Sequence, residues 1–243
     1  MDCTIQRECP MRPTDDTYAE LQTAFDHFNA ELFDDSLPPC LLTLQREKKT
    51  YGYFSAERFV HRGDGSRTDE IALNPAYFGI VPLLEVMQTI AHEMAHLWQH
   101  HFGKPGRRRY HNVEWADKME SIGLMPSSTG KPGGKRTGEH MADYPIEGGR
   151  FLAACDKLLT KDFRISWADR FPARHVAAQA LEAATEDGAI DMDGISLAPA
   201  TGSQNKPTRT KYTCPACETN VWGKPELKLV CGECGNAYEV NED

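Results

Sequence analysis

The motif His92-Glu93-Met94-Ala95-His96 narrows the fold of this 243-residue chain more than any other pattern in it. It lies within a stretch from Pro82 to His101 that begins with proline and carries apolar residues along one face, which predicts a helix. Residues four apart share a helix face, so both imidazoles can reach one metal ion. Glu93 stands close enough to take a proton from a metal-activated water. The motif therefore predicts a catalytic zinc site with Glu93 as general base.

The third ligand of such a site is not decided by the motif. A catalytic zinc ion takes three protein ligands and keeps one position open. A metzincin pattern would need glycine at position 99 and histidine at position 102, where Gln99 and Phe102 stand. The downstream candidates are the carboxylates and imidazoles of Glu114, Glu120, His100, His101, His111 and His140. His100 lies one turn beyond His96, too far for the same ion unless the helix bends.

Four cysteines near the C-terminus form a second metal pattern. Cys214 and Cys217 form one C-x-x-C pair, and Cys231 and Cys234 form another after thirteen residues. Two such pairs place four thiolates around one zinc ion, which supplies folding energy to a short module. This spacing predicts a structural zinc ribbon, whereas a redox dithiol would need only one pair. Two aromatic residues lie near these cysteines, Trp222 and Tyr238. They either stack on unpaired bases or form the small core of the ribbon.

Composition limits the function classes. Hydrophobic residues make up 40% of the chain and charged residues 26%, and the net charge is −9. No apolar run is long enough to span a bilayer, and residues 1–13 lack an apolar segment, so we expect a cytoplasmic protein without membrane contact. The acidic balance argues mildly against a protein that coats nucleic acid. However, residues 102–136 carry eight basic and three acidic residues. The candidates for phosphate contacts in this segment are Arg107, Arg108 and Arg109. The alternative interpretation is that these arginines lie in a solvated loop without a ligand.

Periodicity predicts an α+β chain. We expect a flexible tail over residues 1–16, a main domain over 17–165, a helix and flexible linker over 166–209, and the ribbon over 210–243. Expected helices cover residues 17–33, 82–101, 113–122, 148–159 and 175–185. Expected strands cover residues 41–44, 50–54 and 69–73, whereas residues 127–149 suggest a loop. The strand from Ile71 to Asn74 either pairs with an extended substrate or lies inside the sheet.

These residues resemble the SprT-like (Spartan-type) metallopeptidases. That family pairs an H-E-M-x-H helix with a third histidine in an H-x-x-E-[FW] setting, which His111-Asn112-Val113-Glu114-Trp115 fits. Further similarity covers Tyr51-Gly52-Tyr53-Phe54, Ile71-Ala72-Leu73-Asn74-Pro75 and the upstream helix. About half the chain is similar to the family. The resemblance implies His111 as the third zinc ligand, with Glu114 as a supporting residue or the next candidate.

The resemblance also implies a fold and an activity. It implies a zincin-like core of helices packed on a small sheet, and a zinc-dependent endopeptidase that cleaves proteins bound or crosslinked to DNA. The expected partners are a protein substrate and single-stranded or damaged DNA, with a nucleoid-associated location if DNA is bound. One alternative is a DNA- or protein-binding adaptor with a vestigial peptidase site, and another is a metallopeptidase unconnected with DNA. The candidates for stabilising an oxyanion remain Tyr110, His140 and Tyr144.

Overall fold

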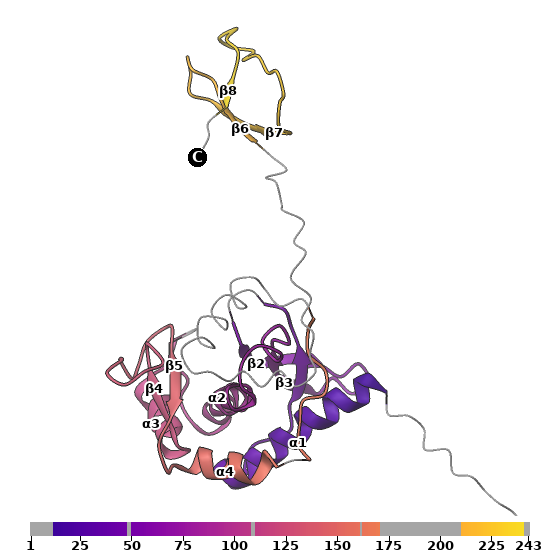
Figure 1. Cartoon of the computed structure of the whole chain (residues 1–243), viewed down its shortest axis with the longest axis vertical. Helices are drawn as coiled ribbons and strands as arrows, with labels where there is room; N and C mark the ends of the chain where they lie inside the picture. The colour runs from indigo at the N-terminus through magenta and orange to yellow at the C-terminus, as the bar shows by residue number, and fades with distance from the viewer. Residues whose placement is uncertain (1–11, 48–49, 108–109, 161, 171–209, 241–243) are drawn as a thin grey trace, which may run out of the picture. The chain divides into compact units, whose positions relative to one another are not determined.

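The computed structural model describes residues 12–47, 50–107, 110–160, 162–170 and 210–240. The chain divides into two compact units, Met1–Ala198 and Pro199–Asp243 (Figure 1). The described residues form four helices and eight strands, so this is a mixed α+β chain, as the sequence predicted. No helix among these residues is long and apolar enough to cross a membrane. The helix expected over residues 175–185, like most of the expected linker, lies outside the described residues.

Helix α1, Pro13–Phe33, forms one side of the core of the N-terminal unit. It begins at Pro13, four residues earlier than predicted, because proline fits the first turn and Asp15 and Asp16 favour a helix N-terminus. Its apolar face is buried in the core, and its members include Leu21, Phe25, Phe28 and Leu32. The helix ends where Asp34 takes the left-handed conformation and its N–H bonds back to Asn29.

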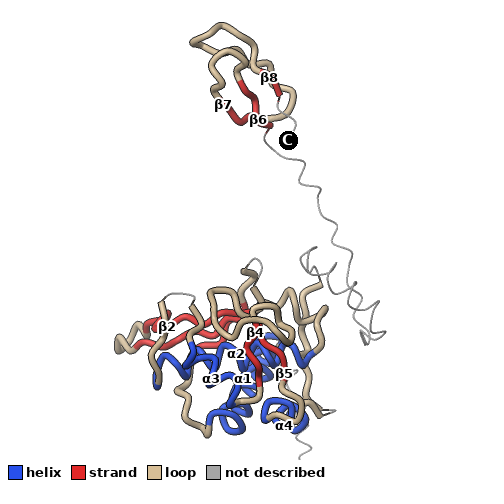
Figure 2. Tube along the Cα trace, turned by 90° about the vertical axis from the view of Figure 1, so that its left-hand side faces the viewer, coloured by secondary structure: helices blue, strands red, loops and turns tan. Residues whose placement is uncertain are grey.

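A three-stranded sheet covers one side of the helices in this unit (Figure 2). The strands are β1 (Leu41–Leu44), β2 (Gly52–Val60) and β3 (Arg67–Leu73), in the order β1-β3-β2. Strand β3 is parallel to β1 and antiparallel to β2. Strand β3 is therefore internal. Of the two interpretations left open for Ile71–Asn74, this position favours a strand inside the sheet over one that pairs with a substrate. Among the described residues β1 and β2 are the two edge strands, and the register of β2 with β3 shifts between Ser55 and Phe59.

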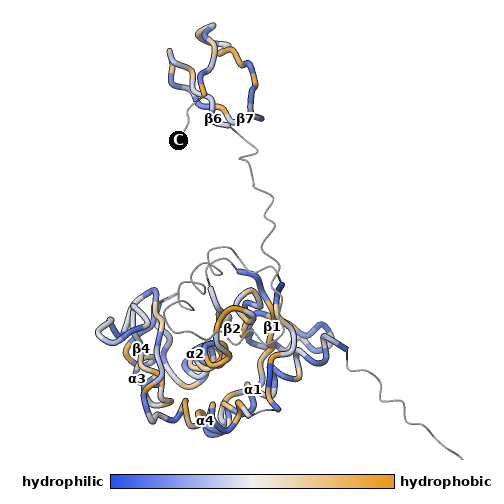
Figure 3. The backbone as a smooth tube through the Cα atoms, viewed as in Figure 1, coloured by the Kyte–Doolittle hydropathy of each residue, from blue (hydrophilic) through white to orange (hydrophobic). Residues whose placement is uncertain are grey.

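Helix α2, Leu83–Phe102, packs between α1 and the sheet and carries the H-E-x-x-H motif. Its buried side chains include Met87, Ile90, Met94 and Leu97, which join the core. In Figure 3 the hydrophobic colour follows α2 and the strands beside it. A shorter helix, α3 (Val113–Ser121), follows and buries Trp115, Ala116 and Met119.

Residues 127–149, predicted as a loop, contain part of a second sheet. Strand β4 (Leu124–Ser127) pairs antiparallel with β5 (Ala142–Pro145). Pro126 faces Asp143 in this register, and neither residue is typical of strands. For this reason the two strands could not be predicted from the sequence. Helix α4 (Arg150–Leu158) follows and packs on α1.

The C-terminal unit is a three-stranded sheet with two cysteine-bearing turns. Its strands are β6 (Thr210–Thr213), β7 (Asn220–Gly223) and β8 (Glu239–Val240), in the order β7-β6-β8. Tyr212 is buried, and its hydroxyl donates to the carbonyl of Lys224 and accepts from the N–H of Leu227.

Candidate metal centre

Three histidines converge on one point of the N-terminal unit. His92 and His96 come from α2, and His111 directly precedes the first turn of α3. One ring nitrogen from each lies within 4.8 Å of the others, and Nε2 of His96 is 3.1 Å from Nε2 of His111. The structure therefore brings together the two motif histidines and the third histidine that the family resemblance implied.

The start of α3 is fixed to α2 through Asn112. The Asn112 side chain caps α3 by accepting from the Trp115 N–H at 3.1 Å. The same oxygen accepts from Nε2 of Gln99 on α2 at 2.7 Å. This polar link places the residue before the cap, His111, opposite the motif histidines.

The ring of His111 is oriented by the loop that precedes β5. His111 and Gly138 exchange two backbone hydrogen bonds, of 2.8 and 3.2 Å. Nδ1 of His111 lies 3.1 Å from the Gly138 carbonyl oxygen. A carbonyl only accepts, so Nδ1 carries the proton and Nε2 keeps its lone pair toward the centre.

The ring of His92 is oriented by Asp143 on β5. Nδ1 of His92 lies 2.8 Å from Oδ2 of Asp143, and the Asp143 carbonyl accepts from Nε2 of Gln88 at 2.8 Å. Asp143 could not be predicted from the sequence, because it lies 51 positions from His92 in a segment whose composition is typical of a loop. Carboxylate–histidine pairs of this kind hold metal-binding imidazoles in one tautomer and orientation.

Aromatic side chains enclose the three imidazoles. Trp115 is fully buried, and its ring centre lies 4.9 Å from that of His92, 5.3 Å from His96 and 4.4 Å from His111. Phe54 of β2 stacks on His96 with 6.5 Å between ring centres. Aromatic surroundings lower the local dielectric constant and so strengthen electrostatic interactions at the centre.

Glu93 is a buried carboxylate next to this cluster. It is 6% exposed, and burial raises its pKa to about 7; the Asp143 charge adds to this rise, whereas the His92 charge and the Phe54 N–H oppose it. Gly52 lies against it, because a Cβ atom there would be 3.5 Å from Cγ of Glu93. Glu93 can therefore exchange a proton near neutral pH.

The imidazoles differ in charge preference. Burial, together with the charges of His92 and His111, lowers the pKa of His96 well below its ordinary value. Burial and the His92 charge lower the pKa of His111 to about 4. Burial also acts to lower the pKa of His92, but the hydrogen bond with Asp143 and the charge of Glu93 outweigh it and raise that pKa. His96 and His111 are thus neutral at pH 7, the form that binds metal.

The donor set fits a zinc ion. Tetrahedral zinc with bonds of about 2.0–2.1 Å places its nitrogen ligands about 3.3 Å apart, close to the 3.1 Å between His96 and His111. The Nδ1 hydrogen bonds of His92 and His111 leave their Nε2 atoms free.

The other candidates have different contacts. The Glu114 carboxylate accepts from Nε2 of Gln99 at 2.9 Å and from the Lys104 N–H at 2.6 Å, so it holds the end of α2. Glu120 pairs with Arg136. Arg107 pairs with Glu139 at 2.9 Å and lies over the Tyr110 ring. Arg108 and Arg109 lie outside the described residues.

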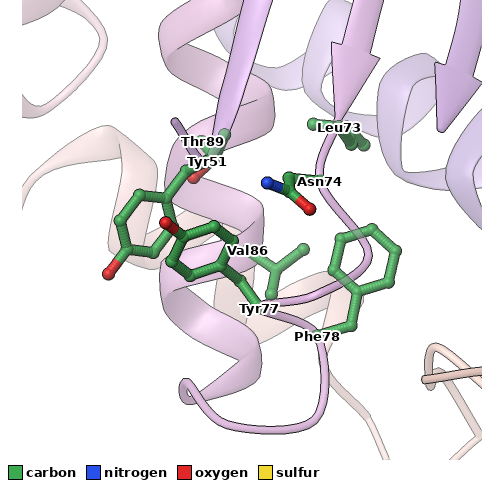
Figure 4. Close-up of a pocket in the computed structure, with 7 residues that line it drawn as sticks. All are labelled: Tyr51, Leu73, Asn74, Tyr77, Phe78, Val86 and Thr89. Carbon is green, nitrogen blue, oxygen red and sulfur yellow. The ribbon is translucent and has the colours of Figure 1, made fainter. Parts of the chain in front are cut away.

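A small pocket lies beside this centre, between β2, α2 and the turn after β3 (Figure 4). Tyr51 and Tyr77 stack at its mouth with 3.9 Å between ring centres. Its lining residues are Tyr51, Leu73, Asn74, Tyr77, Phe78, Val86 and Thr89. None of the three histidines lines the pocket.

The four cysteines of the C-terminal unit also converge. One sulfur from each of Cys214, Cys217, Cys231 and Cys234 lies within 4.8 Å of the others. The sulfurs of Cys217 and Cys231 are 3.7 Å apart, close to the roughly 3.8 Å expected for two thiolates on one tetrahedral zinc ion. Hydrogen bonding with Thr219 lowers the pKa of Cys217 to about 6. This cluster is compatible with a zinc ribbon.

Comparisons with known proteins agree with this arrangement. The model of the SprT-like family matches residues 21–132, which contain all three histidines and Glu93. A Salmonella typhimurium protein, described as an uncharacterized protein in the mucB 3' region, is 63% identical over 59 residues, or 24% of this chain and 80% of that protein. No solved structure matches the chain. On this evidence the chain belongs to the SprT-like family.

Proposed function

We propose that this protein is a zinc-dependent endopeptidase of zincin type. The observation that carries the proposal is the convergence of three imidazole nitrogens beside the buried carboxylate of Glu93. His92, His96 and His111 would hold the ion. When bound, zinc supplies Lewis acidity, which polarises a carbonyl group and lowers the pKa of water to about 7.

Glu93 serves as the general base in this proposal. It accepts a proton from the attacking water and passes it to the leaving amine. A carboxylate whose pKa lies at about 7 can do both near neutral pH, because neither protonation state is strongly favoured. The Phe54 N–H supports its charged form, and Asp143 keeps His92 in one orientation.

The substrate lies along β2 as an extended segment. Strand β2 is at the edge of the sheet, and its Phe54 contacts both Glu93 and His96. The free edge of such a strand binds an extended peptide through main-chain hydrogen bonds. Strand β3 lacks a free edge, since β1 and β2 flank it. This geometry favours unfolded or flexible segments of proteins.

We further propose that the protein substrates are bound or crosslinked to DNA. The support comes from the C-terminal unit, where Trp222 of β7 is 62% exposed and lies opposite Lys211 of β6. An exposed aromatic ring stacks on an unpaired base, and a neighbouring ammonium group contacts the phosphates. Arg107 adds a basic group near the histidine centre, although Glu139 partly neutralises it.

Metal removal tests the peptidase. A chelator should abolish cleavage of an unfolded protein by the full chain, and one equivalent of zinc beyond the ribbon's own should restore it. His111→Ala should bind one zinc fewer and stay inactive, whereas His61→Ala, a change at an exposed hairpin, should behave as wild type. Full cleavage by zinc-loaded His111→Ala would rule out the proposed centre. DNA binding without cleavage by any variant would favour an adaptor.

A further inference from the structure

A third group of metal-binding side chains lies at the C-terminal end of α2, outside the histidine centre. It consists of Asp69 on β3 and the consecutive residues His100 and His101 on α2. One donor atom from each lies within 4.8 Å of the others. We propose that these three residues bind a divalent transition-metal ion.

The carboxylate of Asp69 is the fixed part of this site. Asp69 is 5% exposed, and its Oδ1 accepts from the Glu57 N–H at 2.7 Å. That bond holds the carboxylate at the bulge of β2, where Glu57 has a positive φ of 46°. Its Oδ2 lies 2.7 Å from Nε2 of His101, and its Oδ1 lies 4.0 Å from Nε2 of His100. A buried carboxylate needs compensation by cations, and both imidazoles face it.

The spacing of these atoms suits an ion after small side-chain rotations. Ligands on tetrahedral zinc stand about 3.3 Å apart, between the observed 2.7 and 4.0 Å. The side chains of His100 and His101 are 32% and 35% exposed, so the rings can adjust and an ion can enter from solvent. Both imidazoles are within ion-pair distance of Asp69, one at each carboxylate oxygen, so the three donor groups already converge.

The donor set selects the class of ion. Two imidazoles and one carboxylate suit zinc, nickel, cobalt or iron(II), whereas magnesium and calcium prefer oxygen ligands alone. A bound ion would join the end of α2 to β3 and, through Asp69, to the bulge of β2. Phe54 separates this site from the histidine centre, with its ring centre 5.8 Å from that of His100 and 6.5 Å from that of His96.

Zinc counting by equilibrium dialysis of the full chain tests the site. Wild type should bind one equivalent more than the two held by the histidine centre and the ribbon, and magnesium should not compete for it. His100→Gln and His101→Gln should each weaken the additional equivalent at least about tenfold. His61→Ala is the matched control and should bind as wild type, because His61 and Asp64 form an exposed pair at 2.9 Å that no third metal-binding side chain joins among the described residues.

Thermal unfolding of the same proteins gives a second readout. Free zinc at about 100 times its dissociation constant for this site should raise the Tm of wild type and His61→Ala by about 5–10 °C beyond the two-zinc form. His100→Gln should lose this rise while retaining its other two zinc ions, which shows that it remains folded. Two equivalents in wild type, or three in every variant with the same affinity, would overturn the proposal.

Discussion

Glu93 places a carboxylate where burial makes its charge costly. It is 6% exposed, and its pKa of about 7 lies well above the ordinary 4.5. Local rules of stability are broken at functional sites more often than elsewhere, and the same burial that destabilises the charge produces a base suited to neutral pH. The burial that gives Glu93 the pKa required by the proposed mechanism therefore also costs the fold stability.

This cost predicts a pH-dependent stability difference between zinc-free wild type and zinc-free Glu93→Gln. A raised folded-state pKa contributes stability that is fully present below 4.5 and is lost as the pH rises through about 7. Glutamine has no such loss. Between pH 5 and pH 8 the free energy of unfolding of the variant should therefore rise by about 1 to 3 kcal/mol relative to that of wild type. Urea unfolding at both pH values measures this; an unchanged difference would contradict the burial argument.

Asp143 is expected to act through His92. Asp143→Asn keeps the shape but removes the charge that fixes the ring, so zinc affinity at the histidine centre should fall about 10- to 100-fold. Competition with a zinc chelator measures the change. Asp156→Asn, on the exposed face of α4, is the control and should leave the affinity unchanged. Equal affinities for both variants would show that Asp143 does not position His92.

The site residues differ in how far the sequence alone could predict them. His92, Glu93 and His96 follow from helical spacing, and the four cysteines from their paired spacing. The third ligand was not decided by spacing, and only the family resemblance singled out His111. The groups that orient the rings, Asp143 and the Gly138 carbonyl, are 51 and 27 positions from their partners. Contacts over such separations leave no local pattern in one sequence.

At the scale of elements, the close approach of β2 to α2 positions the strand along which we propose that the substrate lies. Gly52 makes this approach possible, because a Cβ atom there would be 3.0 Å from Cγ2 of Thr89 on α2, as well as 2.8 Å from the Ala72 carbonyl oxygen on β3. The second distance involves backbone and cannot be relieved by a side-chain rotation. A glycine at this position therefore keeps the edge strand beside Glu93.

Gly52→Ala should consequently push the start of β2 away from both β3 and α2. We expect a loss of about 1–3 kcal/mol in the free energy of unfolding, as in other overpacked sites, together with weaker proteolysis. The control is Ala56→Ser on the exposed part of the same strand, which should change stability by less than about 0.5 kcal/mol. Denaturant unfolding compares the two, and wild-type stability in Gly52→Ala would refute the packing argument.

Helices were more predictable than strands for a physical reason. The periodic apolar faces of α2 and α3 span two or more turns. The predicted bounds of α2 differ from the observed ones by one residue at each end, and those of α3 by one residue at the C-terminal end. Strands β4 and β5 have four residues each and are specified by pairing with each other rather than by local propensity. For this reason the predicted loop over 127–149 was wrong at Ser127 and at Ala142–Pro145, the strand that supplies Asp143.

The whole molecule combines a histidine centre in one unit with a four-cysteine cluster in the other. Its net charge of −9 gives no general attraction to DNA, so any binding must come from local groups such as Trp222 and Lys211. If the units have the proposed functions, DNA contact by the C-terminal unit would raise the effective concentration of DNA-bound protein substrates at the N-terminal unit.

Cleavage of a DNA-binding protein by wild type and Glu93→Gln, each with and without single-stranded DNA, tests this account most directly. Zinc is first counted in both proteins to establish that each holds its full complement. We expect cleavage by wild type, enhanced by DNA, and a loss of at least about 100-fold in Glu93→Gln, because general-base catalysis contributes 10²–10⁴-fold. Equal cleavage by the two zinc-loaded proteins would contradict the assignment of Glu93 and the peptidase centre built around it.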